Sequence, residues 1–294
     1  MDKKVINKII PKYWKNCKKV CEYSAAIVDL WGVVHDGKNP YPFVIECLQK
    51  LRNKGVKIIF LSNSPRRVLY VERQIQSIGV PKNCYDYLIS SGELVFLTLQ
   101  ARSKNREKKK FFKIAPKGID YLSEGMKDIE EKSIEKADYI LLIGPYNDEK
   151  DKLNQYHDIL NKAAILSIPI ICANPDLFVM KGNKIALCAG SIAQEYLKYG
   201  GKVEFFGKPH PYAYKECFKF LDNYEKNSIV AIGDSPYTDI AGAHNQKIDS
   251  LFVAGGLHKK ELIDNNKIDP DSVKNLFIKQ NVALPKAVIN TMVW

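Results

Sequence analysis

The fold is decided by residues 25–37, which read Ala25-Ala26-Ile27-Val28-Asp29-Leu30-Trp31-Gly32-Val33-Val34-His35-Asp36-Gly37. A short apolar run ends in the carboxylate of Asp29, and the chain then breaks at glycine. This pattern is typical of a buried strand in a parallel sheet, and open α/β sheets bind their ligands at the C-terminal ends of such strands. We therefore expect Asp29 to lie in a ligand site, as a candidate nucleophile.

Two later stretches repeat this pattern of an apolar strand followed by polar side chains. Residues 56–61 lead into Ser62-Asn63-Ser64-Pro65, and residues 228–232 lead into Gly233-Asp234. Pro65 suits the first turn of a helix after the first of these strands, and a further helix is expected from about Tyr237 to Asn245 after the second. Alternating strands and helices predict an α/β fold with a parallel sheet and right-handed crossovers.

The middle of the chain predicts a second α/β domain, inserted into the first. We expect a discontinuous core domain at 1–86 and 205–294 and the inserted domain at 87–204. A strand at 248–253 is expected to close the core sheet, with one or two helices after His258 and two short helices, or a helix and a turn, within residues 1–22. The inserted domain is expected to contain strands at 111–114, 139–143 and 168–172, helices at 92–102, 117–123, 149–165 and 190–199, and a hairpin around Gly182-Asn183.

Composition narrows the class of protein. The net charge is +12 over 294 residues, but lysine is spread along the whole chain, which indicates a solvated surface and no nucleic-acid partner. The seven cysteines include no CxxC pair, so reduced thiols are expected. The chain shows neither a signal-peptide pattern nor 18 consecutive apolar residues, so we expect a cytoplasmic protein without a membrane partner.

The polar residues after the strands suit phosphoryl transfer. A carboxylate nucleophile can approach an anionic phosphate only if a cation screens the repulsion, and Mg²⁺ accepts carboxylate and phosphate oxygens. Asp29 and Asp234 could supply those carboxylates, and Asp239 could reach the metal through a bound water. Ser62 could donate its hydroxyl to a phosphate oxygen, and Lys208 could neutralise the transferred group.

As an ordered set, these residues resemble the four motifs of the haloacid dehalogenase (HAD) superfamily. The motifs correspond to Asp29–Gly37, Ser62-Asn63, Lys208-Pro209 and Gly233-Asp234 through Asp239. The large insert and the turn at Asn174-Pro175-Asp176 are similar to the C2-capped, class IIA branch, which includes phosphatases of sugar phosphates, nitrophenyl phosphate and pyridoxal phosphate.

The resemblance implies a Rossmann-like core with an inserted α/β C2 cap and a Mg²⁺-dependent phosphatase of a small phosphorylated metabolite, such as a sugar phosphate. It implies an aspartyl-phosphate on Asp29, with Mg²⁺ held by Asp29, Asp234 and the backbone carbonyl of Trp31. Ser62, Asn63, Arg66 and Lys208 are the expected phosphate- and substrate-binding residues. A homodimer formed through the cap is a further expectation.

Trp31 departs from the family pattern. In the family's phosphatases this position is a second aspartate that transfers protons, and an indole cannot do so; such acid–base help is typically worth about 10²–10⁴-fold in rate. The chain resembles a class IIA subgroup with Asp-x-Trp-Gly in the first motif. His35 and Asp36 are the candidate substitutes for proton transfer. The alternative is a catalytically weak phosphate-binding or regulatory protein.

Two further sites have competing interpretations. Arg66 or Arg67 could bind an anionic substrate through its guanidinium group, or both could simply line a solvated helix face. His210 follows Lys208-Pro209, and we expect it to be a loop or packing residue in place of a catalytic base.

Overall fold

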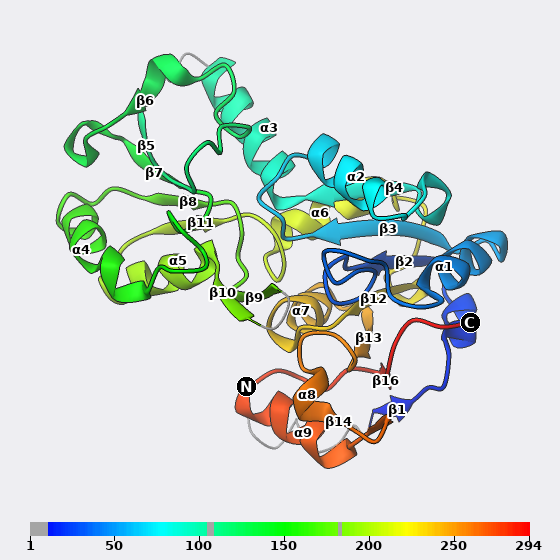
Figure 1. The fold of residues 1–294 in the computed structure, drawn as a ribbon. Coiled ribbons are helices and arrows are strands. Elements are labelled where there is room, and N and C mark those ends of the chain that lie inside the picture. The colour runs from blue at the N-terminus through cyan, green and yellow to red at the C-terminus, as the bar shows by residue number, and fades with distance from the viewer. Residues whose placement is uncertain (1–10, 105–108, 182–183) are drawn as a thin grey trace. The chain divides into compact units, whose positions relative to one another are not determined.

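The computed structural model describes residues 11–104, 109–181 and 184–294 (Figure 1). The chain divides into two compact units, each made of separate segments. The first unit comprises Met1–Ser62, Glu72–Ile89 and Tyr214–Trp294, and the second comprises Asn63–Val71 and Ser90–Ala213. The expected domain boundaries at 86/87 and 204/205 stay a prediction; the strand that begins at Tyr87 belongs to the sheet of the first unit.

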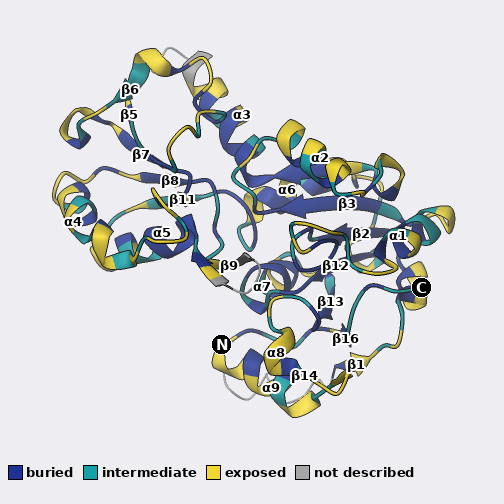
Figure 2. Ribbon diagram, in the orientation of Figure 1, coloured by how far each residue is buried: buried dark blue, intermediate teal, exposed yellow. Residues whose placement is uncertain are grey.

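A seven-stranded sheet forms the centre of the first unit, and its pairs from β1 to β3 are parallel. Strand β2 lies between β12 and β3, which explains why its four residues are all apolar and buried (Figure 2). In spatial order the strands are β1 (Lys12–Tyr13), β16 (Ala287–Ile289), β13 (Asp249–Val253), β12 (Ile229–Gly233), β2 (Ala25–Val28), β3 (Lys57–Ser62) and β4 (Tyr87–Ser90).

Helices connect the strands of this sheet. Helix α2 is divided between the two units, at Val71 and Glu72. A π-helical turn, η7, directly precedes α7. The helices are α1 (Val44–Asn53), α2 (Val68–Ser77), α6 (Pro211–Lys219), η7 (Pro236–Ile240), α7 (Ala241–Gln246), α8 (Lys259–Leu262) and α9 (Pro270–Lys279), with 3₁₀-helices η1 (Cys17–Glu22), η2 (Lys82–Cys84) and η6 (Lys226–Ser228).

The chain termini differ from the sequence prediction. Strand β13 does not close the sheet, because β16 and β1 extend it beyond that strand. Residues 11–22 hold β1 and η1 where helices were expected, and the expected apolar positions before residue 11 lie outside the described residues. The tail forms α8, a small hairpin of β14 (Ile263–Asp264) and β15 (Lys267–Ile268), and α9, whose Phe277 meets Phe252 edge-to-face at 5.1 Å.

The second unit contains a five-stranded parallel sheet, in the order β11-β8-β7-β5-β6. A hydrophobic cluster that includes Leu160 on α4 and Ile192 on α5 packs together with its strands. The elements are α3 (Ser91–Lys104), β5 (Phe111–Ile114), η3 (Lys127–Ile129), β6 (Glu130–Glu131), η4 (Ile134–Lys136), β7 (Tyr139–Leu142), η5 (Leu153–Tyr156), α4 (His157–Ile165), β8 (Ile170–Cys172), β9 (Phe178–Lys181), β10 (Lys184–Leu187), α5 (Ala189–Lys198) and β11 (Val203–Phe205).

Two predictions for this unit have different outcomes. The helix expected at 117–123 is wrong: the segment forms turns, and Gly118 adopts a positive φ of 82° that interrupts a helix. The hairpin is confirmed, since β9 and β10 pair antiparallel, although its turn at Gly182-Asn183 lies outside the described residues. Within the described parts of the chain, no helix combines the length and the apolar character needed to span a membrane.

Candidate active site

Three carboxylates converge at the C-terminal edge of the first unit's sheet. Asp29 follows β2, Asp234 follows β12, and Asp239 lies in η7. One oxygen from each carboxylate lies within 4.8 Å of the other two. The register explains the meeting, because Val28 pairs with Ile232 and the backbone N–H of Asp29 donates to the Ile232 carbonyl at 2.9 Å.

Glycines make room for the Asp234 carboxylate. A Cβ atom added at Gly32 would lie 1.8 Å from Asp234 Oδ2, and one added at Gly256 would lie 2.2 Å from the same oxygen. That oxygen also accepts a hydrogen bond of 2.6 Å from the backbone N–H of Leu257. Asp234 is 4% exposed, so it is a buried carboxylate held in one position between two glycines.

Asp239 is oriented by the turn that carries it. Its Oδ2 accepts a hydrogen bond of 3.1 Å from the backbone N–H of Ser235, whose own side chain caps the turn by accepting from Thr238 N. A Cβ atom at Gly233 would lie 2.0 Å from the Asp239 Cγ, so this glycine permits the close approach. Asp239 therefore reaches back toward the strand end from the following turn.

The three carboxylates fit a hard divalent cation. Two of them are buried and all three are close enough to repel one another, so a cation that binds oxygen would compensate their charge. The donor set offers oxygen alone, which suits Mg²⁺ or Ca²⁺ better than zinc. The Trp31 carbonyl as a further ligand stays a prediction.

The loop after Asp29 places Trp31 against His35. Their rings meet nearly edge-on, with centroids 5.4 Å apart and planes at 72°. His35 is 3% exposed, and its Nδ1 accepts a hydrogen bond of 2.9 Å from the backbone N–H of Gly37. Burial lowers the pKa of His35 to about 4, so the imidazole is neutral at pH 7 and Nδ1 is occupied as an acceptor. This geometry favours a role for His35 in loop structure over proton donation.

Asp36 has a different environment in the same loop. It is exposed, and its Oδ1 accepts hydrogen bonds of 2.8 Å from the backbone N–H groups of Lys38 and Asn39. These bonds lower the pKa of Asp36. Asp36 is therefore ionised at neutral pH and could act as a base more readily than as an acid.

The second unit builds a separate hydrogen-bonded group around Asn63. The Asn63 side chain donates to Asp176 Oδ1 at 2.8 Å and to the Lys208 carbonyl at 3.0 Å, and it accepts from the Lys208 backbone N–H at 2.7 Å. Asn174 closes the Asn-Pro-Asp turn by accepting from the Asp176 N–H at 2.9 Å. Both ends of the Asn63 amide thus hold the Lys208 backbone, a role that sequence reasoning missed because the partners are far apart in the chain.

The other predicted ligands have clear positions. Ser62 is buried at the last residue of β3, and Lys208 is 3% exposed. Arg67 forms an ion pair with Glu93 at 3.2 Å and lies over the Phe96 ring. Its guanidinium charge is therefore already engaged by contacts within the protein. Arg66 is exposed on the same segment, so it is better placed than Arg67 to meet a solute.

His210 packs as expected for a structural residue. Its ring stacks on Phe205 with centroids 4.6 Å apart and planes at 1°, and its backbone N–H donates to the Gly207 carbonyl. Burial lowers the pKa of His210, which favours the neutral ring at pH 7.

Comparison with known proteins gives consistent matches. A family model described as haloacid dehalogenase-like hydrolase matches residues 26–126, and a second HAD hydrolase-like model matches residues 205–277. A crystal structure of a hydrolase of the haloacid dehalogenase-like family from Brucella suis 1330 is 30% identical, covers 95% of this chain and 100% of its own, and has a TM-score of 0.80.

Two further relatives are more distant in sequence. A Staphylococcus aureus (strain USA300) protein named acid sugar phosphatase is 21% identical over 261 residues, or 85% of this chain and 93% of its own. The solved p-nitrophenyl phosphatase from Archaeoglobus fulgidus is 20% identical, covers 92% of this chain and 96% of its own, and has a TM-score of 0.66, which supports the fold.

Proposed function

The chain belongs to the haloacid dehalogenase-like hydrolases, and on that premise we propose that it is a Mg²⁺-dependent phosphatase of a small phosphorylated metabolite. The observation that carries this proposal is the meeting of Asp29, Asp234 and Asp239 at one sheet edge. The relatives named acid sugar phosphatase and p-nitrophenyl phosphatase support a phosphate monoester as the substrate, with a sugar phosphate as the favoured class.

In the proposed reaction an Asp29 oxygen attacks phosphorus, the ester P–O bond breaks, and water later hydrolyses the aspartyl-phosphate. Bound Mg²⁺ would screen the charge between the Asp29 carboxylate and the phosphate. Ser62 and Lys208 are proposed to hold the phosphoryl oxygens by hydrogen bonding and by charge. Asn63 is proposed to act through Lys208, since its amide is bonded to the backbone of that residue.

Trp31 supports a second candidate function. Without a carboxylic acid at this position, the leaving oxygen lacks the expected proton donor, which costs about 10²–10⁴-fold in rate. The alternative is therefore a protein that binds a phosphorylated ligand and turns it over slowly or not at all. Retention of Asp29, Lys208 and Asp234 together favours the enzyme.

The deciding experiment is a panel of phosphate monoesters assayed with Mg²⁺, comparing wild type, Asp29→Asn and Trp31→Asp. If the protein is a phosphatase, wild type should turn over at least one monoester, and Asp29→Asn should lower that rate by about three orders of magnitude. Turnover that is absent in wild type but gained in Trp31→Asp would contradict the phosphatase proposal and favour the binding alternative. Untouched turnover in Asp29→Asn would rule out the covalent mechanism.

The substitute for the missing acid–base residue can be found by the same assay. We propose Asp36 as the base that activates the hydrolytic water, because its carboxylate is exposed and its pKa is lowered, whereas the buried His35 is a neutral acceptor in its loop. Activity that survives Asp36→Ala but is lost in His35→Ala would reverse this assignment.

We also propose a cytoplasmic location and a homodimer formed through the second unit. All seven cysteines are free thiols, which supports a reducing compartment. Sedimentation of the full chain tests the dimer.

A further inference from the structure

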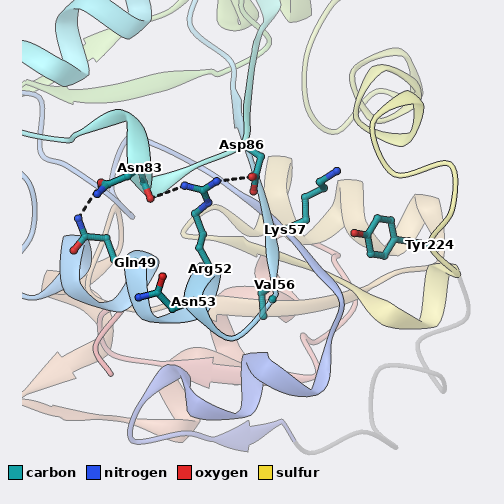
Figure 3. A pocket seen from close by; sticks show the side chains of 9 residues that line it. Gln49, Arg52, Asn53, Val56, Lys57, Asn83, Asp86 and Tyr224 are labelled. Carbon is teal, nitrogen blue, oxygen red and sulfur yellow. Dashed lines mark hydrogen bonds and ion pairs between the residues drawn. The ribbon is translucent and has the colours of Figure 1, made fainter.

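A cavity of about 480 Å³ lies in the first unit at the N-terminal end of β3 (Figure 3). Strand β3 begins at the cavity with Lys57 and ends with Ser62, so about 17 Å of extended chain separates the cavity from the proposed catalytic edge. Its volume suits a small molecule. The side chains that matter here are Gln49, Arg52, Lys57, Asn83, Asp86 and Tyr224.

Arg52 presents a fixed plane in this cavity. Its guanidinium donates to the Asn83 carbonyl at 2.7 Å and to Asp86 Oδ1 at 2.6 Å (Figure 3). Asp86 is itself held, because its Oδ2 accepts from the Ile58 backbone N–H at 2.8 Å. These contacts use the edge of the guanidinium, and the Arg52 side chain is 29% exposed. The faces of guanidinium groups stack on planar rings, so this is the contact that we expect Arg52 to make with a ligand.

Lys57 supplies an uncompensated positive charge. Its ammonium lies 5.6 Å from the Tyr87 ring centre and 6.0 Å from that of Tyr224. Among the residues that the structure describes, no carboxylate forms an ion pair with Lys57, and the nearby Asp86 is already paired with Arg52. The charged groups that line the cavity therefore sum to one positive charge, which favours a ligand with one anionic group.

Two amides supply an unused acceptor beside an unused donor. Gln49 Nε2 donates to Asn83 Oδ1 at 2.9 Å (Figure 3). In the described part of the chain, this leaves Gln49 Oε1 and Asn83 Nδ2 without hydrogen-bond partners. An acceptor next to a donor complements the hydrogen-bonding edge of a nucleobase.

We propose that this cavity binds a nucleoside monophosphate. The base stacks on the Arg52 guanidinium and bonds to Gln49 and Asn83, while the phosphate meets Lys57. A planar ring, a donor–acceptor edge and one anionic group are the three features that the cavity recognises, and a nucleotide combines them. The site is separate from the proposed catalytic residues and does not depend on phosphatase activity.

The test is calorimetric titration of the full chain, in EDTA, with the 5′-phosphonate analogues of AMP and GMP. The carbon–phosphorus bond resists hydrolysis and EDTA removes divalent metal, so the catalytic site does not consume the probe. We expect binding by wild type, with affinity reduced about tenfold or more in Lys57→Met. Lys54→Met is the matched control, since Lys54 is an exposed lysine outside the cavity lining, and its affinity should equal that of wild type.

Two more variants keep the test decisive. Asn83→Asp replaces the free donor by an acceptor and should weaken binding to a similar degree, whereas Lys57→Arg keeps the charge and should restore most of the affinity lost in Lys57→Met. Ribose 5-phosphate and adenosine, which lack the base and the phosphate respectively, should each bind at least tenfold more weakly than the nucleotide analogue. The proposal is overturned by no binding at millimolar concentration, by equal affinity in Lys57→Met and wild type, or by equal affinity for either fragment.

Discussion

Replacing Gly32 by alanine should damage the metal site while leaving the fold in place. Gly32 has a φ of 84°, and its new methyl group would lie 1.8 Å from Asp234 Oδ2 and 2.6 Å from Asp234 Cγ. Asp234 has little room to retreat, because Gly256 also lies close to it: a Cβ atom added there would lie 2.2 Å from Asp234 Oδ2. The carboxylate must therefore leave its position and give up its hydrogen bond from Leu257.

The expected loss in the free energy of unfolding of Gly32→Ala has two contributions. A left-handed backbone conformation costs a residue with a side chain about 1–2 kcal/mol. Loss of the hydrogen bond to the buried carboxylate costs about 1.5–3 kcal/mol more. Gly32→Ala should thus lower the free energy of unfolding by about 2.5–5 kcal/mol. Gly79→Ala is the matched control: Gly79 has a φ of 95°, no neighbouring group lies within 4 Å of the place its methyl group would take, and the variant should lose the backbone contribution alone.

The assay is urea unfolding of both variants and wild type, with and without Mg²⁺. A ligand at 100 times its dissociation constant stabilises the native state by about 2.7 kcal/mol. Wild type and Gly79→Ala should both show this Mg²⁺-dependent gain, and Gly32→Ala should lose most of it. An equal loss of stability in Gly32→Ala and Gly79→Ala, together with an equal response to Mg²⁺, would show that Gly32 does not hold Asp234 in place.

Two further predictions concern the second unit. Asn63→Asp should lower the free energy of unfolding by about 2–4 kcal/mol, since it removes two donated hydrogen bonds and faces Asp176 with a second carboxylate; Asn174→Asp keeps its acceptor and should be near wild type in the same urea titration. Burial lowers the pKa of His210, so below about pH 6.5 the unfolded chain takes up a proton that the folded chain refuses and stability falls. His210→Phe keeps the stack on Phe205 and should reduce this fall between pH 7.5 and 5.5; the remainder comes from His35 and His258, whose pKa values burial also lowers. An unchanged slope would contradict the assignment.

The central strands could be predicted from sequence because they are buried on both faces. Apolar runs such as residues 25–28 and 229–232 need no partner information to be identified, and the carboxylates that follow them are placed by the parallel register. Strand β16 has only three residues and β1 only two, too few to show a period, and their pairing depends on segments from opposite ends of the chain.

The environment of the site residues could be predicted only in part. Asn63 was expected to bind phosphate, but its amide bonds to residues 113 and 145 positions away, a relation that spacing in one sequence does not encode. The role of the glycines around Asp234 could not be predicted either. Gly256 belongs to no recognisable motif, and it matters only because the absence of a side chain there leaves room for the Asp234 carboxylate. Local pattern predicts which residues reach the sheet edge, whereas long-range contacts determine what each side chain does there.

The packing of Trp31 bears on how this first motif could have evolved. A Cβ atom at residue 37 would lie 2.3 Å from the Trp31 ring, so the indole needs glycine at that position, and the same ring rests against His35. A lineage that exchanged Trp31 for aspartate would leave a gap against both neighbours, and the reverse exchange would meet any side chain at residue 37. We therefore expect residues 31, 35 and 37 to be inherited as a set, with intermediates that alter one position alone at a disadvantage.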